Sequence, residues 1–335
     1  MQKWKNWMNR FRIFYSALKK KENIFYMFFT RGLLFWVLKS LSFVPQEVNL
    51  VLLGCNLDAD EIEWIRKNLK LPFYHIEEYH QDSDVWECLT QVNEYHFGWL
   101  DIDCFVLNPR FFGKMIVLEP RTFANTVWSI QNQFHEFMCT YFLFLNIDCV
   151  KSVYESGLDI TPHAYSDIRV QVNISPDFAC KVLSEKHKRL VSDTIKHYYD
   201  DNGKYQFDTL QLYQLAAESI GYSIHKLTHL RGYISMNMDR YFSNDIIHIG
   251  ASSHFLDVSR TNKYSEHFIL LKLAYLLLCK YNTILPTSYK LTLKLTRFKL
   301  LGISQSVNLQ KVEEDIRKYF TEKNVNAASI EKILN

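Results

Sequence analysis

Apolar and polar positions alternate in blocks along the chain from residue 48 onward. Three short apolar runs have the length of buried strands, and the segments between them space apolar residues as amphipathic helices do. The order strand, helix, strand, helix, strand is typical of a parallel α/β sheet, in which ligands bind outside the carboxyl ends of the strands. The expected strands are 48–54, 72–80 and 97–106. One expected helix follows Asp58, which has capping-box spacing to Glu61, and another covers 83–95.

The rest of the chain mixes strands and helices. The sequence YKLTLKLTRFKLL at 289–301 fits a strand or a helix, and it is either core or a contact with lipid. We predict an α/β fold with one Rossmann-type mixed sheet flanked by helices, amphipathic helices before it and a helical extension after it. Further strands are expected at 122–130, 139–147, 167–175 and 245–255, and helices at 184–199, 208–220 and around 312–320. The predicted parts are a membrane-associating segment (1–45), a catalytic domain (46–262) and an apolar, basic extension (263–335).

The first 21 residues form the most regular helical pattern. Residues 1–45 contain nine lysines and arginines against Glu22 as the one acid, on a chain of net charge +3. A basic helix with an apolar, tryptophan-containing face is typical of the interface of an anionic membrane; alternatively, the face packs on the protein's own body. Two apolar runs in 24–44 could deepen such an anchor, but Arg31 near the middle argues against a transmembrane span. The apolar face comprises Trp4, Trp7, Met8, Phe11, Phe14, Tyr15 and Leu18.

Composition limits the remaining classes of function. Hydrophobic residues make up 48% of 335, enough for a sizeable core and unlike a disordered chain. The seven cysteines form no CxxC pair and mostly have apolar neighbours, so we expect reduced thiols and a cytoplasmic location at the membrane face. No secretory signal is expected. Nucleic acid is not an expected partner, because the basic residues accompany tryptophans on one helix and no reading module is present.

The segment WLDIDCFVLNP at 99–109 holds the strongest chemical signal. Residues i and i+2 of a strand point to the same face, so Asp101 and Asp103 would converge while Ile102 and Cys104 face the core. Neighbouring carboxylates repel unless a cation lies between them. Mg²⁺ or Mn²⁺ would take these oxygens and complete its shell with diphosphate oxygens and water. An isolated Asp-x-Asp is a weak signal, since acids at strand ends often cap turns.

The stretch FGWLDIDCFV resembles the DxD segment of GT-A-fold glycosyltransferases, and the resemblance extends across residues 48–256. It implies that Asp103 is the main carboxylate ligand of a metal. Asp101 would bind the ribose or a water molecule on the metal. His248, which lies two residues before Gly250, would be a third ligand of the metal. His248 alternatively is a core histidine between isoleucines. Asp208 in FDTLQLYQLAAE resembles the acid near the bond being made, or it caps a helix with Gln211.

Other parts of the resemblance concern the nucleotide. The loop after the first strand would meet it through Gly54, Cys55 and Asn56, and the small residues Ser252 and Ser253 would let the backbone approach a phosphate. The Lys-Pro-Trp that some retaining members carry after the histidine is absent. Arg260 or Lys263 could stand in for that lysine, and the stereochemical outcome stays open.

The resemblance therefore implies a metal-dependent glycosyltransferase. It would use Mn²⁺ or Mg²⁺ and a nucleotide-sugar donor, and its acceptor would be a lipid-linked or cell-surface glycan. A phosphatase of the haloacid-dehalogenase type also uses Asp-x-Asp, but it usually places the motif at its first strand. Such a phosphatase usually has a small or β-branched residue two positions after the second aspartate, where this chain has Phe105. A membrane-surface scaffold that keeps a transferase-like fold without catalysis is the other alternative.

Overall fold

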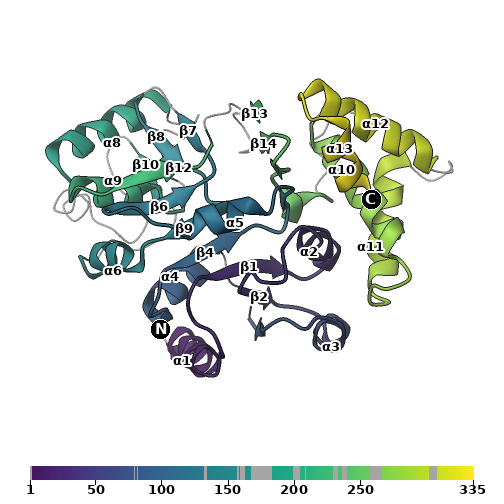
Figure 1. The fold of residues 1–335 in the computed structure, drawn as a ribbon, viewed down its shortest axis with the longest axis horizontal. Helices are drawn as coiled ribbons and strands as arrows, with labels where there is room; N and C mark the ends of the chain where they lie inside the picture. Colours follow the sequence, from purple (N-terminus) through teal and green to yellow (C-terminus); the bar gives the residue numbers. More distant parts are fainter. Residues whose placement is uncertain are drawn as a thin grey trace. The chain divides into compact units, whose positions relative to one another are not determined.

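The computed structural model in Figure 1 describes most of the chain. Its twelve described α-helices include four consecutive ones at the end of the chain, so the predicted helical extension is confirmed and 289–301 is a helix. The described residues are 2–78, 80, 82–131, 134–156, 158, 163–166, 183–198, 204–207, 209–228, 233–235, 240–256, 266–301 and 308–335. The helices are α1 (Gln2–Ser16), α2 (Leu34–Leu41), α3 (Ala59–Asn68), α4 (Asp82–Val92), α5 (Arg110–Met115), α6 (Ile147–Glu155), α8 (Glu185–Tyr198), α9 (Gln211–Ser219), α10 (Glu266–Tyr281), α11 (Tyr289–Leu301), α12 (Leu309–Glu322) and α13 (Ala327–Leu334).

The main sheet has seven strands in the order β12-β6-β9-β4-β1-β2-β3. The pairs β12–β6, β4–β1 and β2–β3 are parallel, and β6–β9 is antiparallel. This mixed sheet with flanking helices confirms the predicted α/β class. Its strands are β1 (Ile24–Thr30), β2 (Leu50–Cys55), β3 (Phe73–Ile76), β4 (Phe97–Leu100), β6 (Thr122–Thr126), β9 (Phe142–Leu145) and β12 (Ser223–Lys226).

Smaller sheets accompany the main one. A four-stranded sheet has the order β13-β14-β15-β5, and two antiparallel pairs of strands are β10–β11 and β7–β8. The strand predicted at 167–175 lies outside the described residues. The strands are β5 (Cys104–Val106), β7 (Ser129–Gln131), β8 (Glu136–Met138), β10 (His163–Ser166), β11 (Lys204–Phe207), β13 (Tyr233–Ser235), β14 (Arg240–Phe242) and β15 (Ile246–His248).

Contacts divide the chain into two compact units, each made of three separate segments. Both units contain residues from the first 45 positions and from the middle of the chain. The predicted division into an anchor, a catalytic domain and an extension stays a prediction, because it concerns function. Unit 1 is Met1–Tyr26, His80–Trp99 and Phe112–His229, and unit 2 is Met27–Tyr79, Leu100–Phe111 and Leu230–Asn335.

The described part of the apolar face of α1 packs inside unit 1. Trp7, Phe11 and Tyr15 are between 1% and 4% exposed, and α1 contacts α4. Trp7 stacks on His80 with 5.3 Å between ring centroids, and the Tyr15 hydroxyl accepts a hydrogen bond from the Glu94 backbone N–H at 3.1 Å. The structure therefore follows the alternative in which this face packs on the protein itself. The periodicity is the same for a protein or a lipid partner, and a membrane association of residues 1–45 stays a prediction.

Residues 24–44 are also part of the fold rather than the extension of an anchor. Ile24–Thr30 form the largely buried strand β1, and Leu34–Leu41 form α2, whose apolar residues are mostly buried. Lys39 is 2% exposed and donates to the Lys332 carbonyl at 2.8 Å; burial, with Lys280 nearby, lowers its pKa to about 8. Within the described part of the chain, no helix combines the length and apolarity needed to cross a bilayer.

Candidate metal and nucleotide site

A turn, rather than a continuous strand, positions the two aspartates. Strand β4 ends at Leu100 and β5 begins at Cys104, so the prediction of one strand over 97–106 was wrong. The Cys104 backbone N–H donates to the Asp101 carbonyl at 3.1 Å, which closes a turn of the i to i+3 type. The turn, and not the pleat of a strand, brings both carboxylates to one side.

Three side chains of unit 2 converge at this turn, and we call Asp101, Asp103 and His248 the aspartate cluster. Each offers one ligand atom, and these atoms lie within 4.8 Å of one another. His248 Nε2 is 3.4 Å from Asp103 Oδ1 and 3.7 Å from Asp101 Oδ2. Ligand atoms around one divalent ion with bonds of about 2.1 Å are about 3 to 4.2 Å apart. The three side chains therefore fit a divalent cation with small adjustments.

His248 reaches the cluster because β15 pairs with β5. In this antiparallel pair His248 is opposite Cys104, the residue that follows Asp103. The His248 side chain is 7% exposed and the Asp103 side chain 5%, whereas that of Asp101 is 34% exposed. His248 is thus buried, as the core alternative required, and it also faces the carboxylates. Solvent or a ligand reaches the cluster from the side of Asp101.

The loop after β15 wraps around Asp103. The Ile249 backbone N–H donates to the Asp103 carbonyl at 3.1 Å, and the Ser252 N–H donates to Asp103 Oδ2 at 3.2 Å. Between them, Gly250 and Ala251 have φ of 71° and 59°, the left-handed region that is unfavourable for alanine. Such local strain is often stored next to functional sites. The loop fixes the position of the Asp103 carboxylate.

Electrostatics keep Asp103 ionised. Burial alone raises the pKa of its carboxyl, but the nearby His248 imidazole and the hydrogen bonds from the Ser252 backbone and hydroxyl outweigh burial and lower it. A buried carboxylate held in the charged form is the state that a metal ion requires. Ser252 is 5% exposed and is used to hold Asp103, whereas Ser253 is exposed. Their predicted approach to a phosphate stays a prediction.

Gly54 and Cys55, predicted in a loop, are the last two residues of β2, and their identity has packing reasons. A Cβ on Gly54 would lie 2.4 Å from Leu57 Cδ1, so a larger residue there would require the Leu57 side chain to move. Cys55 is fully buried, and Asn56 is exposed with φ of 52° at the end of the strand. The predicted nucleotide contacts of Gly54, Cys55 and Asn56 are not tested by these observations. Asn56 is the member of the three whose side chain is open to a ligand.

Several predicted residues lie outside the described part of the chain. They are the acceptor acid Asp208 and the diphosphate candidates Arg260 and Lys263. Helix α9 begins at Gln211 with Leu210 as its N-cap residue.

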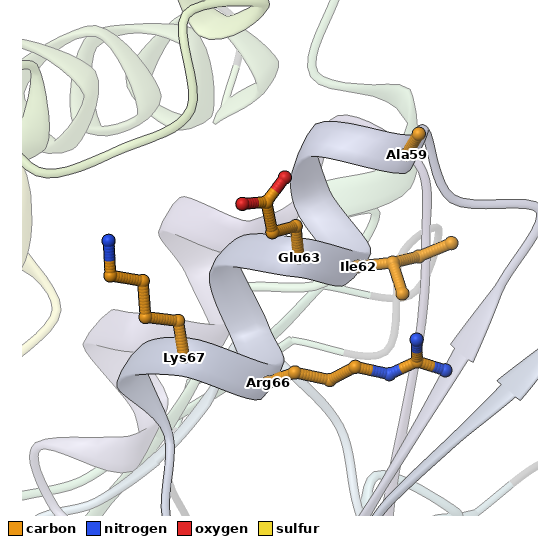
Figure 2. A pocket seen from close by; sticks show the side chains of 5 residues that line it. All are labelled: Ala59, Ile62, Glu63, Arg66 and Lys67. Carbon is orange, nitrogen blue, oxygen red and sulfur yellow. The ribbon is translucent and has the colours of Figure 1, made fainter.

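A hollow on α3 is separate from the aspartate cluster. Figure 2 shows its five lining side chains, which all belong to this one helix. The hollow has a volume of about 580 Å³. Its lining mixes Glu63 with Arg66 and Lys67 and includes none of the residues predicted to bind donor or metal. We assign it no role in the site.

A second polar cluster in unit 1 was missed by the sequence analysis. We call His135, His187 and Glu218 the glutamate cluster. Glu218 Oε2 lies 3.0 Å from His135 Nε2 and 3.1 Å from His187 Nε2, and Glu218 Oε1 accepts from Gln214 Nε2 at 2.8 Å. His187 Nδ1 is 2.8 Å from Ser184 Oγ. The three residues are far apart in sequence and no motif joins them, so no sequence signal could have found them.

Comparison with known proteins supports the glycosyltransferase class. Residues 2–150, less than half of the chain but including both aspartates, match the family described as StrH glycosyltransferase N-terminal domain. The chain is 30% identical over 113 residues to the dTDP-dihydrostreptose–streptidine-6-phosphate dihydrostreptosyltransferase of Streptomyces griseus. That match covers 33% of this chain and 29% of the relative, so the chain spans less than a third of the curated relative it matches.

Solved structures with partial likeness include a glycosyltransferase and a nucleotidyltransferase. The glycosyltransferase GlyE of Streptococcus pneumoniae is 14% identical with a TM-score of 0.30, over 40% of this chain and 36% of that chain. A cytidylyltransferase of Leptospira borgpetersenii is 11% identical with a TM-score of 0.29, over 80% of this chain and 97% of that chain.

Proposed function

We propose that the chain is a glycosyltransferase that takes its sugar from a nucleoside-diphosphate donor and uses a divalent cation at the aspartate cluster. The observation that carries the proposal is the convergence of Asp101, Asp103 and His248 within 4.8 Å, at the predicted motif. The match of residues 2–150 to a glycosyltransferase domain supports the reaction class. The name of the Streptomyces griseus relative makes a dTDP-linked sugar the first donor to test.

The three ligands suggest which cation is bound. Two carboxylates suit Mg²⁺ or Mn²⁺, while an imidazole is a better ligand for Mn²⁺ than for Mg²⁺. We therefore expect Mn²⁺ to bind more tightly. When bound, the cation would neutralise negative charge that develops on the departing diphosphate.

The protein's own residues divide the remaining work. Asp103 and His248 are buried and would hold the inner side of the ion, and Asp101, a third exposed, would face the donor. The Ser252 hydrogen bond keeps Asp103 from rotating away. Asp208 is the proposed base for the acceptor, which we propose to be a glycan hydroxyl, lipid-linked or on the cell surface.

The decisive test compares Asp103→Asn with Glu63→Gln, a matched removal of one carboxylate in the α3 hollow. We expect Asp103→Asn to weaken Mn²⁺ binding, measured by calorimetry, and to slow Mn²⁺-dependent release of dTDP from a dTDP-sugar by about 100-fold or more. Glu63→Gln should change neither quantity. Unaltered Mn²⁺ affinity in Asp103→Asn and Asp103→Ala would refute the site. Cleavage of a simple phosphomonoester without release of dTDP would identify the phosphatase alternative.

A further inference from the structure

Helix α11 is drawn in yellow-green in Figure 1. It has an apolar stripe on its exposed side. Leu291, Leu295 and Phe298 are 63%, 44% and 51% exposed. At about 100° per residue, these three side chains leave the helix within an arc of about 60°. The buried residues Tyr289 and Thr296 lie on the other side of the helix, where Tyr289 hydrogen-bonds to Glu61. The stripe therefore faces away from the body of unit 2.

Positive charge surrounds this stripe. Helix α11 carries four cations and no acid, and no aspartate or glutamate occurs anywhere from residue 267 to residue 312. Lys294 and Lys299 flank the stripe on its two sides at helical spacing, and all four basic residues of the helix are exposed. They are Lys290, Lys294, Arg297 and Lys299. An exposed apolar stripe with cations on both sides is complementary to a partner that is apolar inside and negative at its surface.

We infer that α11 is the surface through which this protein binds an anionic lipid membrane. The stripe would enter the boundary between headgroups and acyl chains, and the lysine and arginine side chains would extend to lipid phosphates. Such a helix lies in the interface and does not need to span the bilayer. A second copy of this chain fits the same face less well, because a two-fold contact would bring like charges together.

This inference moves the lipid contact from one end of the chain to the other. Both α1 and α11 are basic and periodic, but α1 buries its stripe in unit 1 whereas α11 exposes its own. Ile13, 73% exposed on α1, provides a matched control in a basic helix. The inference does not depend on the proposed reaction, because it rests on the exposed face of α11 alone.

The test measures co-sedimentation of the full chain with phosphatidylcholine vesicles that contain or lack phosphatidylglycerol. We expect binding that requires phosphatidylglycerol and weakens with salt. The triple substitution L291Q/L295Q/F298Q should reduce binding about 100-fold or more, since it removes three large apolar side chains from the contact. The pair K290Q/K294Q should reduce binding about fivefold per cation. Ile13→Gln should leave it unchanged.

Three outcomes would overturn the inference. Unchanged vesicle binding in the triple variant would show that α11 is not the contact, and loss of binding in Ile13→Gln alone would assign the contact to α1. A loss of self-association in the triple variant, with vesicle binding intact, would make the face an interface between copies. Because all substituted side chains are exposed, an unaltered thermal midpoint is expected to confirm folding. Release of dTDP from a soluble donor should also stay unaltered, which separates this test from that of the reaction.

Discussion

The aspartate cluster and the glutamate cluster contain the same kinds of groups and differ in how they are satisfied. In the glutamate cluster, Glu218 accepts hydrogen bonds from two histidines and Gln214 at 2.8 to 3.1 Å. In the aspartate cluster, the His248 imidazole lies 3.4 and 3.7 Å from two carboxylates, longer than a charge-assisted hydrogen bond. Among the described residues, only the aspartate cluster has the spacing of metal ligands.

The difference separates a structural polar network from a candidate binding site. One carboxylate that accepts hydrogen bonds from two histidines and Gln214 is satisfied by the protein itself, and these donors leave it little capacity for a further ligand. Two carboxylates that share one histidine keep excess negative charge, which a cation would compensate. We therefore expect the glutamate cluster to contribute stability and the aspartate cluster to contribute binding.

The largest expected effect concerns Glu218. Replacing it with alanine leaves His135, His187 and Gln214 without their shared acceptor in a largely buried position, and should lower the free energy of unfolding by about 3 kcal/mol. Urea denaturation measures this loss. Asp101→Asn, at the more exposed position of the aspartate cluster, should change the free energy of unfolding by less than about 0.5 kcal/mol. Equal losses in the two variants would contradict the division between the clusters.

Local sequence signals predicted much of the fold around these clusters. The strand ending at Cys55 and the helix after Asp58 appear where expected, and Glu61 accepts from the Asp58 N–H at 3.0 Å as in a capping box. Asp101, Asp103 and His248 lie close together, and their role as metal ligands stays a prediction. These features depend on neighbouring residues, on turn chemistry or on a motif with fixed order, all of which a sequence displays directly.

Other features depend on tertiary contacts that a sequence does not display. The periodicity of α1 indicates that one face is buried, but lipid and protein bury it equally well. An apolar run such as 97–106 does not reveal that the Cys104 N–H closes a turn onto Asp101. Glu218 meets His135 and His187 only because α8, α9 and the segment before β8 come together in unit 1.

The pH dependence of stability gives a second test of the comparison. Burial lowers the pKa of His187 below its ordinary 6.5 more than Glu218 raises it. Burial raises the pKa of Glu218, but hydrogen bonds from His135 and Gln214 outweigh it and lower the pKa below 4.5. Both groups therefore bind fewer protons when folded. The contribution of His187 is present above pH 6.5 and is lost as the pH falls below that value, whereas the contribution of Glu218 is lost only below pH 4.5.

The measurement is the urea midpoint at about pH 7.5 and about pH 5.5. His187→Gln should be less stable than the natural protein at the higher pH and should lose less on acidification, because the titrating imidazole is gone. His225→Gln, which changes a histidine of the same unit outside the cluster, should lose as much as the natural protein. An equal acid-dependent loss in all three proteins would show that His187 does not carry the effect.

The smallest expected effect concerns backbone strain beside the aspartate cluster. Alanine at φ 59° costs roughly 1 kcal/mol more than glycine, but glycine also makes the unfolded chain more flexible, so Ala251→Gly should raise the free energy of unfolding by about 0.5 kcal/mol. Gly250→Ala, at φ 71°, should lower the free energy of unfolding by about 1 kcal/mol.

A freer loop would hold Asp103 less firmly through Ser252, so Ala251→Gly should also weaken Mn²⁺ binding several-fold in a calorimetric titration. If Ala251→Gly destabilised the protein while Mn²⁺ affinity stayed unchanged, strain in this loop would have no part in preparing the cluster for a cation.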